Sequence, residues 1–251
     1  VLGGAFCPTD GFIRPLAMLE GYVAAAKRLG VRFEWGSDVT AIRVDANRRI
    51  SHLETSKGSI EVESVVNAAG AWAATIAAHA GVPLPVEPLR RQAAASVPTT
   101  LLPETTPMTI FVVDGFHFRV RDGRILLLRP SPGAEGHPYD ATVDPEWIDA
   151  VVRVANDRVP GLRGVAMDRG ACWAGLYEMS PDKHAILGPA KECPNLYLVN
   201  GSSGHGVMHS PALGHLLAEM ILDGAASTLD VTALRPSRFE EGDPNPVSEL
   251  L

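Results

Sequence analysis

The sequence has little of what marks several broad classes of protein. Its three cysteines, Cys7, Cys172 and Cys193, are far apart and odd in number, which argues against a disulfide framework and favours reduced thiols in the cytoplasm. No apolar run reaches the roughly 18 residues of a membrane-spanning helix. Acidic residues outnumber basic ones, and the resulting net charge of −7 argues against a nucleic-acid or anionic-membrane partner.

Two further absences concern processing and metals. The sequence has no starting methionine, and its opening, VLGGAFCPTDG, has no basic region of the kind that begins a signal peptide. We expect residues to be missing before Val1. The histidines show no ligand spacing with carboxylates or with each other, so no metal site is predicted. Four of the eight histidines are discounted on this ground: His79, His184, His209 and His215.

What is present is ordinary for a folded chain of 251 residues, with 46% hydrophobic and 20% charged residues. The apolar spacing and the turn residues predict helices over 10–30 and 144–162, and a helix from Ser210 to Asp223 that ends at Gly224. Short strands are predicted between them, in both parallel and antiparallel styles. The doublets Arg48–Arg49 and Arg90–Arg91 are interpreted as solvated turn or strand ends. The fold class expected is α+β.

The order of these elements predicts two interleaved parts and a tail. Residues 1–83 and 169–235 would form part of a cofactor-binding α/β domain. Residues 84–168 would form a mainly antiparallel substrate domain with one covering helix. The segment 236–251 is rich in Pro, Asp and Glu and is predicted to be loosely held.

The stretch NGSSGHGVMHSP at 200–211 lies between an apolar strand and a predicted helix. Glycines 201, 204 and 206 let the backbone approach a ligand closely or take positive φ. A helix N-terminus carries unpaired N–H groups and a partial positive charge, so it attracts an anion or a ring that becomes anionic. The alternative is a glycine-rich connection with no ligand.

Two other segments show a similar small-residue pattern. They are SVVNAAGAW at 64–72 and WAGLYEMSPDKHAILGP at 173–189. Together, in this order, the three segments resemble the D-amino-acid oxidase-like superfamily of FAD-dependent oxidoreductases. The form GLYEMSPDKHAILG is most similar to the sarcosine oxidase beta-subunit and dye-linked proline dehydrogenase branch. The resemblance covers about residues 3 to 224.

The resemblance implies FAD as the cofactor and hydride transfer from an amino acid or secondary amine to flavin N5. It places the adenine-side contact at Val39, near the helix–strand pair of 10–42. Gly175 lies where some relatives carry a cysteine that links the flavin, so non-covalent FAD is expected. The cofactor-binding residues it implies are Val39, Ala68, Ala69, Gly70, Trp72, Gly175, Gly201, Gly204, His205, Gly206, Val207 and Met208.

The resemblance also implies candidates for the substrate side. Tyr177 falls where related enzymes place an active-site tyrosine or arginine, Arg129 where a strand faces the substrate, and His205 in the flavin turn. Each has a plain structural alternative: an interdomain tyrosine, a solvated strand end and a turn residue. Tyr177, Arg129 and His205 are expected to share one cavity. His117 and Arg119 share one strand face, although which face lines the cavity is left open. Met208 stands where sarcosine oxidases carry a substrate-binding lysine, which weakens an assignment to sarcosine.

One departure from the family pattern bears on the cofactor. Family members begin with a βαβ unit carrying G-x-G-x-x-G, which holds the FAD pyrophosphate, and the sequence contains no such motif. We therefore expect this chain alone to hold FAD weakly, and to associate with itself or with a missing N-terminal or second-subunit partner. Two other functions stay open. One is a non-catalytic subunit, and the other is an alcohol-oxidising relative of the glycerol-3-phosphate type, which would need a cluster of Arg119, Arg121, Arg124 and Arg129.

Overall fold

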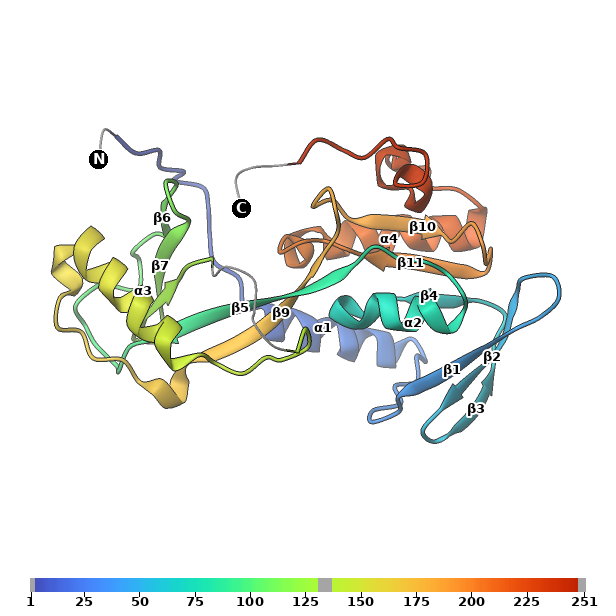
Figure 1. The fold of residues 1–251 in the computed structure, drawn as a ribbon, viewed down its shortest axis with the longest axis horizontal. Helices are drawn as coiled ribbons and strands as arrows, with labels where there is room; N and C mark the ends of the chain where they lie inside the picture. The colour runs from blue at the N-terminus through green and yellow to red at the C-terminus, as the bar shows by residue number, and fades with distance from the viewer. Residues whose placement is uncertain (1–2, 131–136, 248–251) are drawn as a thin grey trace.

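A computed structural model describes residues 3–130 and 137–247. The chain is elongated, with a five-stranded sheet at one end and two three-stranded sheets at the other (Figure 1). The long strands β5 and β9 run between the two ends. Helices and mainly antiparallel strands mix as the sequence predicts, so the α+β fold class is confirmed.

The bounds of the elements are as follows. The strands are β1 (Val39–Val44), β2 (Ile50–Thr55), β3 (Gly58–Glu61), β4 (Val65–Asn67), β5 (Glu87–Ala95), β6 (Thr109–Phe111), β7 (Phe116–Arg121), β8 (Arg124–Leu128), β9 (Trp173–Met179), β10 (Ile186–Pro189) and β11 (Leu196–Asn200). The α-helices are α1 (Pro15–Arg28), α2 (Ala73–His79), α3 (Pro145–Arg158) and α4 (Gly206–Asp223). Short 3-10 helices are η1 (Gly70–Trp72), η2 (Pro160–Leu162), η3 (Arg169–Ala171), η4 (Thr232–Leu234) and η5 (Pro236–Arg238).

The five-stranded sheet has the order β6-β7-β8-β5-β9, and every pair in it is antiparallel. Side chains alternate between the two faces of a strand, so the register assigns each residue to a face. His117 pairs with Leu128, Leu128 with Ala93, and Ala93 with Trp173, which places these four on one face. Their sequence neighbours lie on the opposite face.

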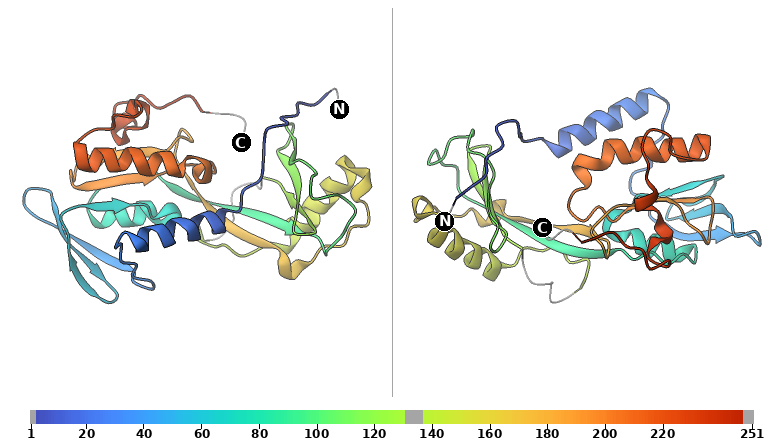
Figure 2. Two further views of the ribbon diagram at one scale, coloured as in Figure 1. Left: turned by 180° about the vertical axis from the view of Figure 1, so that it is seen from behind. Right: turned by 90° about the horizontal axis from the view of Figure 1, so that it is seen from above.

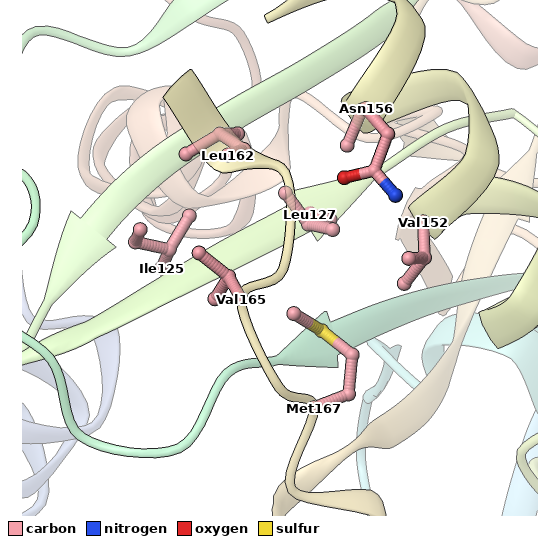
Figure 3. Close-up of a pocket in the computed structure, with 8 residues that line it drawn as sticks. Ile125, Leu127, Val152, Asn156, Leu162, Val165 and Met167 are labelled. Atoms are coloured by element: carbon pink, nitrogen blue, oxygen red, sulfur yellow. The ribbon is translucent and has the colours of Figure 1, made fainter. Parts of the chain in front are cut away.

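Helix α3 covers one face of this sheet (Figure 1). It begins at Pro145, and the Asp144 side chain caps it by accepting a hydrogen bond from the Glu146 N–H. Its apolar stripe packs against a row of strand residues that includes Phe116, which is fully buried. The packing leaves a cavity of about 10 Å³ between β8, α3 and the 162–167 segment (Figure 3). That volume is at most enough for one water molecule, and the lining is almost entirely apolar, so this is a packing gap and not a ligand site.

The sheet at the other end has the order β10-β11-β4. β11 pairs with β4 in parallel, with Leu196 beside Val65 and Leu198 beside Asn67. The carboxyl ends of the two strands therefore lie at the same edge, and the glycine-containing turns 68–72 and 201–205 follow them there. Ligands bind outside this edge in open α/β sheets.

Helix α1 contrasts with α3. Both have 14 residues and begin with proline, but none of the α1 residues is buried, and it lies apart from the sheets (Figure 2). Leu16 and Leu19 of its predicted apolar stripe are 71% and 58% exposed. The preceding segment follows the β7–β8 hairpin, where Arg14 donates to Asp122 and the Phe12 ring lies under the Arg119 guanidinium.

Helix α4 begins at Gly206, so the predicted start near Ser210 is wrong by about one turn. Pro211 lies inside the helix, beyond its first turn. A proline there cannot donate to the carbonyl four residues earlier. The Ser210 hydroxyl donates to that carbonyl, on Val207, at 3.3 Å and supplies the missing bond. The predicted C-cap at Gly224, which adopts the left-handed conformation, is confirmed.

The C-terminal segment makes a buried contact that its composition does not indicate. Arg238 is 1% exposed, and its guanidinium donates two hydrogen bonds to Asp182, at 2.8 and 3.0 Å. The Asn245 backbone and side chain also donate to Asp182. The hydrogen bonds from Arg238 and Asn245 hold the pKa of the buried Asp182 carboxyl well below its usual value, against the upward effect of burial. The predicted loose tail is therefore attached as far as Asn245.

Candidate functional site

The three small-residue segments meet in space. The turns 68–72 and 201–205 share the edge formed by β4 and β11, and η1 packs against both β5 and β9. The turn 201–205 also touches the end of β9, because Met179 bridges Ser202 and the Ser203 N–H donates to the Glu178 carbonyl. Segments more than 100 residues apart in the sequence thus form one site.

Tyr177 and Gly204 are in close contact in this site. A Cβ added at Gly204 would lie 2.6 Å from Cε2 of Tyr177, and Gly204 has a φ of +93°. Only glycine satisfies both conditions without strain. The tyrosine ring therefore lies directly against the turn, and the side chain stays 41% exposed.

His205 is the N-cap residue of α4, and its ring stacks on His209 one turn later, with centroids 6.0 Å apart. Its backbone N–H donates to the Ser202 carbonyl, which closes the turn. The first helical residues, Gly206 and Val207, follow directly, and their N–H groups lie in the first turn, where a helix leaves its amides unpaired. Met208 is 63% exposed beside them. The predicted turn leading into a helix N-terminus is thus confirmed.

Asn67 shapes the second turn from the end of β4. Its buried side chain accepts from the Ala69 N–H and donates to the Ala73 carbonyl, so it bridges the whole turn. Gly70 takes a φ of +55°, and Ala68 and Trp72 remain exposed. The Trp72 ring stacks on Tyr139 at 5.7 Å.

Arg129 is not brought to this place, and the adenine-side contact expected at Val39 stays a prediction. Arg129 follows Leu128, the last residue of β8, and so turns to the other side of the sheet. Its guanidinium lies 3.9 Å from Asp114, which also pairs with Arg158 of α3. Val39 begins β1 and packs into the apolar core of α2, β4 and β11. The structure therefore groups Tyr177 with His205's turn but not with Arg129.

Two charged residues that sequence reasoning missed lie beside Tyr177. Arg91 is on β5, directly opposite Gly175, and its guanidinium carbon is 5.6 Å from the centre of the Tyr177 ring. It is partly buried, so its interpretation as a solvated strand end is wrong. Glu178 accepts from the Ser202 N–H at 3.3 Å, and burial raises the pKa of its carboxyl. No local pattern marks either residue.

The register also decides the face of His117. It shares a face with Leu128, Ala93 and Trp173, and Arg91 and Tyr177 lie on that same face, which α3 does not cover. His117 Nδ1 is 2.8 Å from the Gly115 carbonyl, and burial lowers the pKa of the ring. Arg119 and Arg121 share this face. Arg124 is held by Asp168 and the Ser96 carbonyl, and Arg129 lies elsewhere, so the four arginines do not form a phosphate-binding cluster.

Comparison with protein families shows which family has this arrangement. Residues 1–220 match the family model DAO, described as FAD dependent oxidoreductase. The chain belongs to this FAD dependent oxidoreductase family. Among solved structures, this family member is similar to L-proline dehydrogenase from P. horikoshii, with a TM-score of 0.83 and 32% identity over 95% of this chain and 63% of that chain. Glycine oxidase from Geobacillus kaustophilus gives a TM-score of 0.74 at 25% identity, covering 89% of this chain and 57% of that chain.

Curated relatives of this FAD dependent oxidoreductase give a similar picture. The hydrogen cyanide synthase subunit HcnC of Pseudomonas protegens is 29% identical over 92% of this chain and 53% of its own length. The D-amino acid dehydrogenase of Bradyrhizobium diazoefficiens is 28% identical over 94% of this chain and 54% of its own length. The chain thus spans about half the length of such relatives.

The residues present fit part of an FAD site. The edge has two turns with positive φ, the N-terminus of a long helix and a tyrosine ring packed on glycine. In addition, the side chain of Asn200, just before the turn, is fully buried with no hydrogen-bond partner among the described residues. A buried amide of this kind calls for a partner, which a group outside the described residues would supply.

The structure describes residues 3–130 and 137–247. In that part of the chain no helix is long and apolar enough to cross a membrane. The same residues contain no cluster of three or more His, Cys, Asp and Glu side chains placed to hold a metal ion.

Proposed function

We propose that this chain takes part in the FAD-dependent oxidation of an amino acid or a secondary amine. The observation that supports it most directly is the convergence of Tyr177, the turn 201–206 and the turn 68–72 at one sheet edge, within a family of FAD dependent oxidoreductases. When bound, FAD would accept a hydride from the carbon next to the amine nitrogen. The two relatives named for proline and glycine act on amino acids by their names, which agrees with the proposal.

The chain's own residues would divide the work as follows. The turn 201–206 and the α4 N-terminus would hold one edge of the flavin ring. The backbone N–H donors and the helix dipole there favour the negative charge that develops on the ring. The turn 68–72 would pass close to the cofactor through its small residues. Gly175 has no side chain that could form a covalent link, so the cofactor would be held non-covalently at this position.

Tyr177 would orient the substrate. Its ring is fixed against Gly204, so its hydroxyl has a defined direction at the sheet edge. A hydroxyl at this place would donate to the substrate carboxylate and hold the reacting carbon over the ring. His205 would position the backbone of the turn. Arg129, paired at Asp114, keeps no substrate role in this proposal.

The test uses the protein loaded with FAD. Anaerobic mixing with a panel of cyclic, N-methylated and primary amino acids should bleach the flavin absorption for at least one member. Tyr177→Phe keeps the ring packing and removes the hydroxyl. A hydrogen bond to a charged group is worth about 1.5–3 kcal/mol, so KM should rise roughly 10- to 100-fold while the flavin stays bound.

Two results would count against the proposal. One is protein that binds FAD and is reduced by no amine in the panel. The other is a Tyr177→Phe variant with an unchanged KM for a substrate that does reduce the flavin, which would remove Tyr177 from the site. The expected weak binding of FAD by residues 1–251 alone stays a prediction, and titration of FAD into that purified chain measures it.

A further inference from the structure

The turn 201–205 has a backbone conformation that most residues avoid. Gly201 and Gly204 have φ values of +72° and +93°, and Ser203 between them has a φ of +50° although it carries a side chain. A residue with a side chain stays in this region only where its surroundings hold it there. The contacts of Ser203 therefore show what fixes the turn.

Ser180 holds the turn from the end of β9. The Ser180 N–H donates to the Ser203 hydroxyl at 3.1 Å, and that hydroxyl donates to the Gly201 carbonyl at 2.9 Å. A Cβ added at Gly201 would lie 2.9 Å from the Ser180 Cβ, so Ser180 also packs closely on the turn. Both serines are buried, at 4% exposure each. The conformation of the turn thus depends on where Ser180 lies.

Ser180 shares two acceptor oxygens with Arg238 of the C-terminal segment. The Ser180 hydroxyl lies 2.7 Å from the His184 carbonyl oxygen and 3.3 Å from Asp182 Oδ1. Nη2 of Arg238 donates to the same two oxygens, each at 3.0 Å, and its Nε donates to the other Asp182 oxygen at 2.8 Å. Hydrogen bonds between ionised groups are stronger than those between neutral groups. The guanidinium therefore fixes the two oxygens that hold the Ser180 hydroxyl.

Another arginine of the C-terminal segment has a different kind of partner. Arg235 donates to Glu241 at 2.7 Å and to Asp243 at 2.8 Å, and both carboxylates belong to the C-terminal segment itself. Its side chain is 28% exposed, whereas that of Arg238 is 1% exposed. Arg235 thus makes ion pairs within the segment, and Arg238 connects the segment to the loop that holds the turn.

From these contacts we infer that Arg238 is a positioning residue for the turn 201–205 and acts on it through Ser180. The inference rests on the proposed function, in which this turn holds one edge of the flavin ring. A protein that adopts its binding conformation only part of the time binds its ligand more weakly by that fraction. Arg238 therefore raises the affinity for FAD without touching the cofactor, because it keeps the turn in one conformation.

The experiment measures the opening of the turn and the binding of FAD in the same variants. In Arg238→Met, amide hydrogen exchange of residues 201–205 should become roughly 10-fold faster, because exchange reports how often a segment opens. The dissociation constant for FAD, measured from the quenching of flavin fluorescence, should rise by roughly the same factor. Arg238→Lys keeps one cationic donor and should recover part of both changes.

A second variant tests the route through Ser180. Ser180→Ala removes the hydroxyl that shares its acceptors with Arg238, and it leaves the guanidinium in place. It should also speed exchange of residues 201–205, while the C-terminal segment keeps its protection. In the double variant the two effects should not add, since both changes interrupt the same set of contacts. Additive effects would show that Arg238 does not act through Ser180 and would overturn the inference.

Two controls separate this role from a general loss of stability. Arg235→Met breaks the ion pairs within the C-terminal segment and should leave the exchange of residues 201–205 and the affinity for FAD unchanged. Phe116→Ala removes a fully buried ring from β7, in the other sheet, and should lower the unfolding midpoint without changing the affinity of the folded protein for FAD. Thermal unfolding of each variant reports whether it folds, and Ser180→Ala replaces Arg238→Met if the latter does not.

The outcomes distinguish this inference from the proposed function. Unchanged exchange of residues 201–205 in folded Arg238→Met, or faster exchange with an unchanged dissociation constant for FAD, would overturn the inference. Equal effects of Arg235→Met and Arg238→Met would also overturn it. A protein that loses affinity for FAD in Arg238→Met but is reduced by no amine would reject the proposed function and keep the positioning role. A protein that binds no FAD would reject both.

Discussion

The two faces of the five-stranded sheet are made by the same strands and serve different purposes. The face under α3 carries Phe116, Ile125 and Leu127, which are nearly or fully buried. The other face carries Arg91, His117 and Tyr177, and α3 does not cover it. One face therefore provides stability through apolar burial, and the other exposes polar groups at fixed positions. Because side chains alternate along a strand, a rigid covered face fixes the positions of the groups on the other.

The largest effect should come from the covered face. Phe116→Ala removes a fully buried ring from the apolar cluster under α3 and should lower the free energy of unfolding by about 3–5 kcal/mol. Ile110→Ala is the matched change on the other face, where the side chain is 50% exposed, and should change it by no more than about 0.5 kcal/mol. Denaturant unfolding measures both. Similar losses for the two variants would contradict the division of roles between the faces.

A smaller effect is expected where the uncovered face meets the turn. Gly204→Ala puts a Cβ 2.6 Å from the Tyr177 ring and forces alanine into positive φ, so it should cost about 1–3 kcal/mol of stability and displace the tyrosine. Gly214→Ala makes the same change inside α4, where nothing lies within 4 Å of the new Cβ. It should stabilise by up to about 1 kcal/mol. Thermal unfolding of the two variants should shift in opposite directions, and shifts of the same sign would show that the contact with Tyr177 is not tight.

The smallest effect concerns the charge of His117. Burial lowers the pKa of His117 in the folded chain, so the unfolded chain takes up a proton first as the pH falls. The contribution of the neutral His117 ring to the free energy of unfolding is fully present above the unfolded pKa of about 6.5. It is lost progressively as the pH falls from there through the lower folded pKa. Unfolding midpoints between pH 5 and 7.5 should therefore fall less for His117→Gln than for the wild type. The His79→Gln variant, at an exposed position, should keep the wild-type change of unfolding midpoint with pH. The same pH dependence in His117→Gln as in the wild type would show that His117 is solvated and not buried.

The sequence predicted the parts of the site that depend on local chemistry. The turn around Gly201 to His205 and the three small-residue segments were predicted, and so was a helix over 144–162, which the structure has at 145–158. The pairing of strands that lie far apart in the sequence could not be predicted from it. The environment of Arg91 depends on β9, more than 80 residues later, and a doublet of arginines taken alone indicates a solvated end.

The remaining differences concern the ends of elements. Arg129 stands one position beyond the end of β8, and one position decides which face a strand residue occupies. The start of α4 was misplaced because a proline usually marks the first turn, and the hydroxyl of Ser210 compensates for it further inside. The division into parts 1–83 with 169–235 and 84–168 stays a prediction, and β9 pairs across it with β5 over seven residues.

The buried contact between Arg238 and Asp182 has a consequence for the order in which the site matures. The Ser180 N–H donates a hydrogen bond to the Ser203 hydroxyl, and the Ser180 hydroxyl donates to Asp182. The loop 180–182, which Asp182 anchors, therefore also supports the turn 201–204. The chain leaves the ribosome from its N-terminus at about 5–20 residues per second. The turn is therefore synthesised before the arginine that steadies its support. Arg238 therefore reaches its contact with Asp182 only after the turn 201–204 has left the ribosome.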